Sequence, residues 1–216
     1  MSRTRQRYAF VVFFTITLIT GIVIYGRRLT TNPPGFFIDE SSVAYNALTI
    51  SESGCDEYGA RWPLYFRAFG DYKNPVYVYL LAIIFRFTGP SMVIARMLSA
   101  ASGVVAAIAI GLIGFRLTRQ RWIAGALTLM ALATPWLFVL SRTAVEVAMY
   151  PLAVALFLLA VARVITKTRW TWIDAAAIAL TLALLTYTYS IGRLLAPLLA
   201  IGLILFAKRS GIFSVA

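Results

Sequence analysis

Histidine is absent from this sequence, and only one cysteine, Cys55, is present. Histidine is the most common general base and the most common metal ligand, so any acid–base chemistry must use Asp, Glu, Lys, Tyr or Cys. A single cysteine cannot form an intrachain disulfide, which leaves the redox compartment open. Acidic residues are also scarce, with eight Asp and Glu against 20 Lys and Arg. The positions of these few carboxylates are therefore informative.

Apolar residues make up 61% of the chain, and its mean hydropathy is +0.82. They form long blocks rather than the alternating patterns of a soluble fold, which indicates a membrane protein. A formal net charge of +12 often suggests nucleic-acid binding. Here, however, Lys and Arg mostly lie at the ends of apolar blocks, and we find no soluble basic domain. The basic residues therefore indicate membrane topology, and we expect no nucleic-acid partner.

Six apolar blocks are each about long enough to cross a hydrocarbon core of ~30 Å. They cover residues 8–25, 97–115, 122–140, 145–162, 171–190 and 192–207. The first follows a basic head and is longer than the core of a signal peptide, so we expect a retained helix. A seventh block, residues 75–89, is short, rich in Tyr and interrupted by Arg86.

The distribution of basic residues decides where the seventh block lies. If 75–89 crossed the membrane, eight basic residues after it would lie in outer loops, against the positive-inside rule. If it lies in the interface, the same eight join the N-terminal Arg residues in the cytoplasm. We therefore expect six spanning helices, both termini in the cytoplasm, and one large external segment, residues 26–96. The eight residues are Arg116, Arg119, Arg121, Arg163, Lys167, Arg169, Lys208 and Arg209.

In this topology seven of the eight carboxylates lie on the outer side of the membrane. Glu146 lies at the outer end of the fourth helix, and Asp174 alone lies inside. The simpler interpretation is that loops are polar, but the inner loops hold almost no acids. The other six carboxylates all fall in the external segment: Asp39, Glu40, Glu52, Asp56, Glu57 and Asp71.

Two interfacial helices are predicted within the external segment. In residues 39–54, Val43, Ala47 and Ile50 recur at helical spacing before Gly54, which predicts a short amphipathic helix on the membrane surface. An aromatic-rich stretch follows, and Pro75 then opens the second helix. The predicted fold is an all-α polytopic membrane protein, with residues 1–216 in a single transmembrane domain.

The stretch FFIDESSVAYNA, residues 36–47, places Asp39 beside Glu40 close to the membrane. Adjacent carboxylates repel each other and are partly desolvated there, so we expect the pKa of at least one to be raised. Such a group can take a proton from a hydroxyl. Asp39 would also serve well as a helix N-cap, and the two interpretations are compatible.

Several motifs in this order resemble the GT-C superfamily of membrane glycosyltransferases, which includes protein O-mannosyltransferases and lipid A aminoarabinose transferases. The Asp-Glu pair at 39–40 is similar to one in the family's first external loop, as are the Tyr-Asn-Ala of 45–47 and the Lys-Asn-Pro of 73–75. Further elements lie at Arg96 to Gly103, at Ser141-Arg142 with a downstream acid, and at the Tyr-Thr-Tyr of 187–189 followed by Arg193.

The resemblance implies transfer of a sugar from a polyprenyl-phosphate donor to a hydroxyl of a protein or glycolipid acceptor. The reaction would occur on the external face of a bacterial or archaeal plasma membrane. Asp39 would act as the general base, with Glu40 beside it in the catalytic centre. Whether the reaction needs a divalent metal ion is left open, and no residue is assigned as a metal ligand.

Substrate-binding residues also follow from the resemblance. Positive charge near the leaving phosphate favours its departure, and Lys73, Arg142 and Arg193 are the external candidates. Arg142 and Arg193 can equally be interfacial anchors. The remaining implied contacts are Tyr45, Asn46, Tyr189 and Glu146, of which Tyr189 also fits an aromatic belt and Glu146 stands where the family commonly has Asp.

The resemblance covers nearly the whole chain but only the N-terminal part of the family. We therefore expect a truncated chain, a fragment or one half of a split enzyme, completed by a missing C-terminal half. The alternative is a non-catalytic membrane protein, either a transporter or a subunit that binds the lipid carrier. A transporter would place charges near the middle of its helices and repeat its halves, and neither pattern is found.

Overall fold

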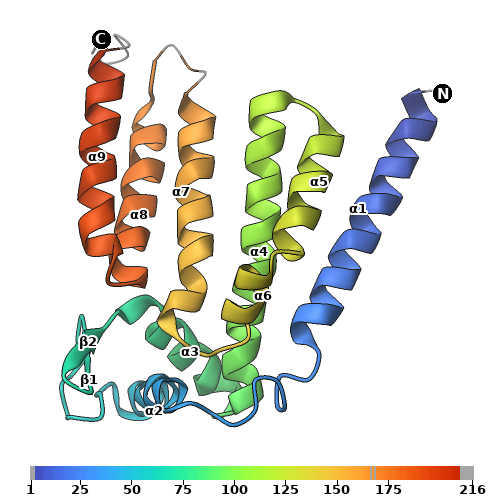
Figure 1. Cartoon of the computed structure of the whole chain (residues 1–216). Helices are drawn as coiled ribbons and strands as arrows, with labels where there is room; N and C mark the ends of the chain where they lie inside the picture. Colours follow the sequence, from blue (N-terminus) through green and yellow to red (C-terminus); the bar gives the residue numbers. More distant parts are fainter. Residues whose placement is uncertain (1–2, 166, 168, 210–216) are drawn as a thin grey trace.

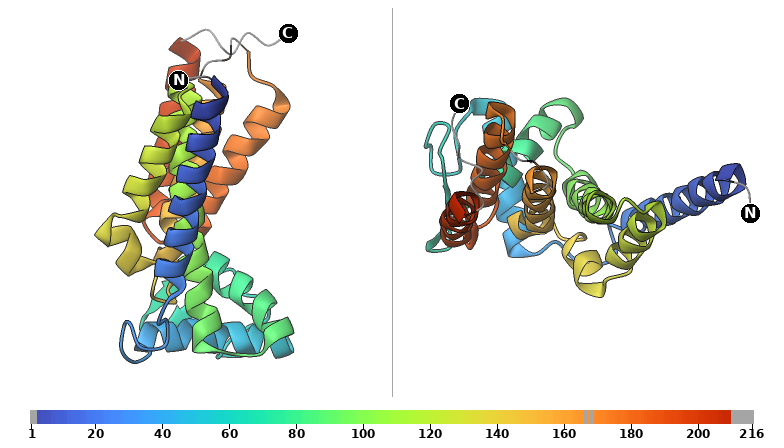
Figure 2. Two further views of the ribbon diagram at one scale, coloured as in Figure 1. Left: turned by 90° about the vertical axis from the view of Figure 1, so that its right-hand side faces the viewer. Right: turned by 90° about the horizontal axis from the view of Figure 1, so that it is seen from above.

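A computed structural model describes residues 3–165, 167 and 169–209 of the chain. Long helices stand side by side in a row, and a smaller layer lies across their lower ends (Figure 1). Seen from above, the row runs from α1 at one end to α9 at the other (Figure 2). The upright helices are α1 (Arg3–Gly26), α4 (Met92–Thr118), α5 (Arg121–Leu132), α7 (Tyr150–Val164), α8 (Trp172–Thr188) and α9 (Gly192–Arg209).

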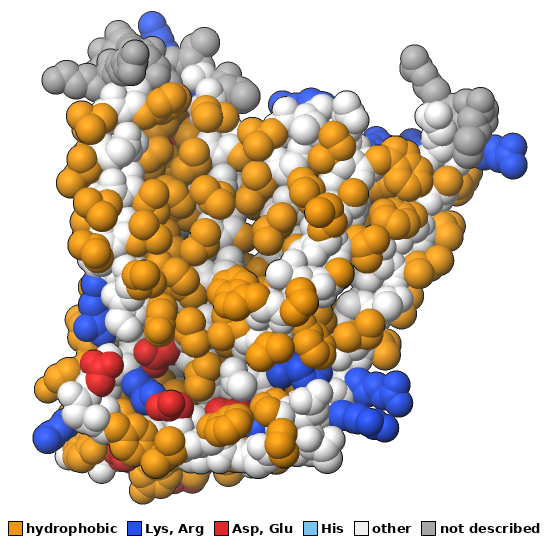
Figure 3. Space-filling view, in the orientation of Figure 1, with side chains coloured by type: hydrophobic (Ala, Val, Ile, Leu, Met, Phe, Trp, Pro, Cys, Tyr) orange, Lys and Arg blue, Asp and Glu red, His pale blue; other side chains and the backbone are white. Residues whose placement is uncertain are grey.

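In the described part of the chain, three helical segments are long and apolar enough to cross a membrane: Thr4–Gly26, Met92–Thr118 and Glu146–Val164. The helices α5, α8 and α9 are also apolar but shorter. Apolar side chains cover the upright helices on the face shown in Figure 3. The structure thus agrees with a helical membrane protein. The charge argument also used Arg3, Lys208 and Arg209, whose side chains lie outside the described part.

The predicted span 122–140 is wrong as one continuous helix. The structure divides it into α5 and the short α6 (Pro135–Leu140), with Thr134 as the N-cap of α6. Pro135 lacks a backbone N–H and fits only the first turn of a helix, so the chain restarts there. The predicted span 145–162 is likewise composite, because the 3-10 turn η1 (Glu146–Met149) precedes α7.

Small residues bring α4 close to its neighbour α5. A Cβ atom added at Gly111 would collide with the Thr128 hydroxyl and would lie 2.7 Å from the Ala124 carbonyl oxygen. A Cβ added at Gly114 would meet the side chain of Leu127. Such small residues allow helix backbones to approach in a membrane, where van der Waals packing replaces the hydrophobic effect.

The layer across the lower ends contains the predicted amphipathic helix as α2 (Ile38–Ser53). It buries Val43, Ala47 and Ile50, and it ends at Gly54, whose φ of 74° is the left-handed conformation that glycine favours. A helix is thus present where the sequence predicts one, and its position on the membrane surface stays a prediction.

The second helix of this layer, α3 (Pro75–Thr88), begins at Pro75 as predicted. It packs against α2 and runs across the lower ends of the upright helices (Figure 1). Tyr77, Val78 and Leu81 are fully buried, whereas Ile83 and Phe87 are exposed. That residues 75–89 lie in the membrane interface stays a prediction.

A β-hairpin departs from the all-α prediction. Strands β1 (Phe66–Ala68) and β2 (Asp71–Lys73) pair antiparallel, with Phe66 opposite Lys73. Phe69 and Gly70, which join them, both have positive φ angles, of 50° and 83°. A two-residue turn with both central residues left-handed matches the natural twist of a hairpin. The hairpin places Lys73 two residues before the start of α3.

Candidate functional site

Acidic and basic side chains gather where the hairpin meets the lower ends of α8 and α9 (Figure 3). Four separate parts of the chain contribute to this region: the first turn of α2, the end of β2, η1 and the start of α9. The named site residues from these parts are Asp39, Lys73, Glu146 and Arg193. The fold therefore assembles residues from widely separated positions.

Asp39 and Lys73 form an ion pair on the accessible side of this region. The distance from the Lys73 Nζ atom to the Asp39 Oδ1 atom is 2.7 Å. The Asp39 side chain is 56% exposed, whereas that of Lys73 is 15% exposed. An exposed carboxylate held by a fixed cation can be reached by a substrate hydroxyl, as the predicted role of Asp39 requires.

Glu40 points away from its neighbour and lies in a buried ion pair with Arg96. Both side chains are fully buried; Arg96 Nε donates to Glu40 Oε1 at 2.9 Å, and Nη2 donates to Oε2 at 2.8 Å. The backbone N–H groups of Phe37 and Ala144 also donate to this carboxylate. These contacts indicate that Glu40 stabilises the fold. Its predicted catalytic role stays a prediction.

The surroundings of Glu40 lower its pKa rather than raise it. Burial raises it, but the hydrogen bonds from Arg96, Ala144 and Phe37 and the charge of Arg96 together hold the pKa below its ordinary value. The capping prediction is also corrected. The helix starts at Ile38, so the N-cap is Phe37, and Glu40 rather than Asp39 binds its N–H.

Arg96 braces the chain that connects α1 to α2. Besides Glu40, it donates to the carbonyl oxygens of Leu29, Pro33 and Gly35, at 2.7, 3.0 and 2.6 Å. Sequence reasoning noted Arg96 only as part of a motif. An arginine in the first turns of an apolar helix was the available signal, because such a charge needs a partner.

Arg142 also binds the chain itself. It donates to the carbonyl oxygens of Ile24, Tyr25 and Arg27 at the end of α1, and to that of Asn32. These carbonyls lack helical partners, and a cation near a helix C-terminus is favourable. Its side chain is buried. Its N–H donors bind these backbone carbonyl oxygens, and its predicted contact with substrate stays a prediction.

Glu146 and Asn74 leave buried polar atoms without partners. The Glu146 Oε2 and Asn74 Nδ2 atoms are buried, and neither has a hydrogen-bond partner among the described residues. Lys73 and Arg193 act on the Glu146 carboxyl group as nearby positive charges, and Asp71 as a negative one. Buried groups of this kind are rare and mark places where a ligand can complete the bonding.

Arg193 closes the opposite side of the site. Its Nη2 atom donates to Asn74 Oδ1 at 2.6 Å and to the Tyr72 carbonyl oxygen at 3.1 Å. Its guanidinium group lies 4.3 Å from the centre of the Tyr65 ring. Arg193 is thus held beside the hairpin with donors to spare, as a contact with an anion requires.

Three further predicted substrate contacts, Tyr189, Tyr45 and Asn46, lie in different surroundings. Tyr189 packs against Tyr150, with ring centres 5.6 Å apart, and the Tyr150 hydroxyl is buried without a partner among the described residues. Tyr45 is exposed on α2. Asn46 is buried and exchanges hydrogen bonds with Glu57, at 2.8 and 3.1 Å, so it braces the end of the α2 layer.

Asn74 and Tyr150 were not predicted as site residues. Asn74 was noted only within the Lys-Asn-Pro motif, and nothing local in the sequence marks Tyr150. In the described part of the chain, no group of three or more Asp, Glu or Cys side chains is placed to hold a metal ion. The site consists of two carboxylates, two cationic side chains and the amide of Asn74.

No protein-family model, curated protein or solved structure matches this chain. The resemblance to the GT-C superfamily accordingly rests on the motifs alone.

Proposed function

We propose that this chain carries the active site of a glycosyltransferase that uses a polyprenyl-phosphate-linked sugar. The observation that carries the proposal is one cluster with three parts: the exposed Asp39–Lys73 pair, the unpartnered buried atoms of Glu146 and Asn74, and Arg193. A base open to an acceptor, buried groups for sugar hydroxyls and two cations for a phosphate are the parts that such a reaction needs.

The reaction begins with the acceptor hydroxyl beside Asp39. The Asp39 carboxylate takes the hydroxyl proton as the acceptor oxygen forms a bond to the anomeric carbon of the sugar. The bond between that carbon and the phosphate oxygen breaks, and the polyprenyl phosphate leaves with the electron pair. Attack opposite the leaving phosphate inverts the anomeric centre. Lys73 and Arg193 stabilise the negative charge that develops on the phosphate.

In this proposal the acceptor and the donor sugar bind on different sides of the site, one exposed and one buried. The acceptor approaches the exposed side of Asp39, and the donor sugar lies toward the buried Glu146 and Asn74. A sugar hydroxyl can donate to Glu146 Oε2 and accept from Asn74 Nδ2, which satisfies both atoms. A protein or a glycolipid can each supply the acceptor hydroxyl.

The proposed topology has six spans, both ends in the cytoplasm, and the α2, α3 and hairpin layer outside. The spans are α1, α4, α5 with α6, η1 with α7, α8 and α9. Two observations support it: the start of α1 and the end of α9 lie at the same end of the molecule, and α2 and α3 lie at the opposite end (Figure 1). The positive-inside distribution favours the same orientation.

The proposal is tested by sugar transfer in membranes that contain the chain and a polyprenyl-phosphate donor with a radiolabelled sugar. The wild type should transfer label to protein or glycolipid. Lys73→Met should lower the rate by about 10²-fold, because the leaving phosphate loses a charge. Arg67→Met is the matched control, since Arg67 is an exposed cation on the same hairpin and should tolerate the change.

Equal rates in both variants would contradict the proposed role of Lys73. Donor that co-purifies with a chain unable to transfer would overturn the catalytic proposal and support the non-catalytic alternative, a subunit that binds the lipid carrier.

A further inference from the structure

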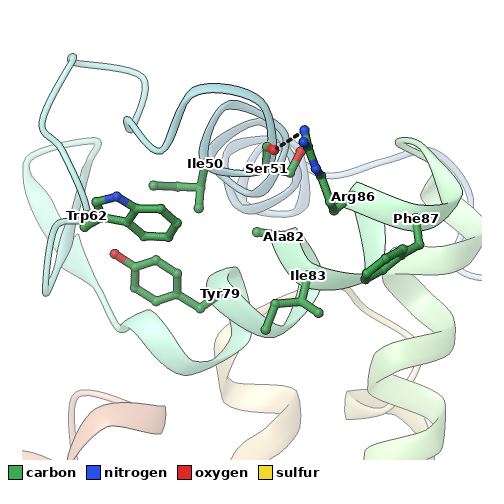
Figure 4. A pocket seen from close by; sticks show the side chains of 8 residues that line it. All are labelled: Ile50, Ser51, Trp62, Tyr79, Ala82, Ile83, Arg86 and Phe87. Carbon is green, nitrogen blue, oxygen red and sulfur yellow. Dashed lines mark hydrogen bonds between the residues drawn. The ribbon is translucent and has the colours of Figure 1, made fainter.

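A cavity lies beside the C-terminal turns of α2 and the helix α3 (Figure 4). Its volume is about 390 Å³, within the usual range for small-ligand pockets. Asp39 and Ser51 are twelve residues apart on α2, or about 18 Å along the helix axis. The cavity is therefore distinct from the charged site. The lining residues are Ile50, Ser51, Trp62, Tyr79, Ala82, Ile83, Arg86 and Phe87.

The walls of this cavity are apolar and aromatic. The Trp62 and Tyr79 rings are stacked, with centres 6.1 Å apart and an interplanar angle of 16°. The Tyr79 hydroxyl donates to the Pro63 carbonyl oxygen at 2.7 Å, so its polar atom is already satisfied. Ile83 and Phe87 are 59% and 84% exposed, which leaves one side open. The space suits a flexible hydrocarbon chain rather than a polar ligand.

Arg86 is the one charged side chain among the residues that line this cavity (Figure 4). Its Nη1 atom donates to the Ser51 carbonyl oxygen at 3.2 Å. No carboxylate of the described residues forms an ion pair with it. A guanidinium group has five N–H donors, so most remain for another acceptor. The cavity thus combines an apolar space with an uncompensated positive charge.

The position of the cavity identifies the source of its occupant. It lies between α2 and α3, in the layer across the ends of the apolar upright helices (Figure 1, Figure 4). If these helices span the bilayer, this layer lies at the level of the lipid headgroups. An amphipathic ligand with an anionic head is abundant there, and Arg is well suited to bind a phosphate.

We propose that this cavity binds one anionic phospholipid of the surrounding bilayer. One hydrocarbon chain lies between Trp62 and Phe87, and the phosphate contacts Arg86. The inference rests on the membrane orientation proposed above but does not require transferase activity. A bound phospholipid would hold α2 and α3 at a fixed depth, and so fix the level of Asp39 relative to the membrane.

The test is native mass spectrometry of the detergent-purified chain with dioleoylphosphatidylglycerol or dioleoylphosphatidylcholine added. The wild type should retain one phosphatidylglycerol in preference to phosphatidylcholine. Arg86→Gln should weaken that binding by about tenfold or more, because a charged hydrogen bond is lost. Arg61→Gln, an exposed arginine in the loop before the hairpin, is the matched control and should bind as the wild type does.

A second pair of variants keeps the two proposals separate. Ile83→Glu places a charge in the open side of the cavity and should abolish binding of phosphatidylglycerol, whereas Asp39→Asn should leave it unchanged. Equal binding by wild type and Arg86→Gln, or equal retention of the two lipids, would overturn the inference. A lipid-free dimer of the wild type would also overturn it, and would show that a second copy covers the cavity.

Discussion

At the scale of single residues, Asp39 and Glu40 are adjacent in sequence but serve different parts of the molecule. Successive residues on a helix point about 100° apart, so one side chain faces Lys73 and the other faces Arg96. The exposed pair belongs to the proposed reaction. The buried pair joins α2 to α4 and to the loop after α6, through Arg96 and the N–H of Ala144.

Glu40→Gln should destabilise the protein by about 3 kcal/mol, because the change leaves the charge of buried Arg96 without its counterion. The control is Glu52→Gln, which changes an exposed carboxylate on the same helix. Thermal unfolding in detergent measures both. Unfolding midpoints that fall equally in the two variants, or in neither, would contradict the bracing role of Glu40.

The same ion pair predicts a dependence of stability on pH. The folded pKa of Glu40 lies below its unfolded value, so its contribution is complete above the ordinary Glu pKa of about 4.3 and is lost as pH falls through the folded pKa. The unfolding midpoint of the wild type should therefore drop below about pH 4.3 more steeply than that of Glu40→Gln. Parallel curves for the two proteins would contradict this assignment.

At the scale of elements, local signals predicted the start and end of helices better than their continuity. Gly54 and Pro75 mark their helix ends by backbone chemistry that depends on a single residue. The hairpin at 66–73 has no alternating pattern to reveal it, and its turn uses Phe69 in a left-handed conformation. Pro135 marks the break between α5 and α6. The predicted span 122–140 followed hydropathy alone, which continues across this break, and so it joined the two helices.

The packing of α4 against α5 predicts different outcomes for two helical glycines. Gly111→Ala should lower the unfolding midpoint, with a cost of about 1–3 kcal/mol, because its Cβ would collide with Thr128. At Gly202 in α9 no atom lies within 4 Å of an added Cβ, so Gly202→Ala should be neutral or slightly stabilising. Equal midpoints for both variants would contradict the close approach of the two helices.

At the scale of the whole molecule, the site depends on contacts that no local pattern contains. The motifs led to Asp39, Lys73, Glu146 and Arg193, and the fold brings these residues to one region. The bond between Glu40 and Arg96 joins positions 56 residues apart, and the four carbonyls around Arg142 belong to the end of α1 and to the loop after it. Side chains with such partners are found only once the tertiary structure is known.

The orientation of the molecule in the membrane can be measured through cysteine. In a Cys55→Ser background, Tyr58→Cys places a thiol at an exposed position in the predicted external segment, and Gln120→Cys places one in a predicted cytoplasmic loop. A membrane-impermeant maleimide should label the first variant in intact cells and the second only after permeabilisation. The reverse pattern would contradict the proposed topology.

The central claim is that Asp39 accepts the proton of the acceptor, and one comparison tests it most directly. Transfer of radiolabelled sugar from a polyprenyl-phosphate donor is measured for Asp39→Asn and for Asp71→Asn, an exposed acid on the neighbouring hairpin. Asp39→Asn should lose about 10²–10⁴-fold in rate while its stability changes by less than about 1 kcal/mol, and Asp71→Asn should remain active. Equal transfer by the two variants would contradict the claim.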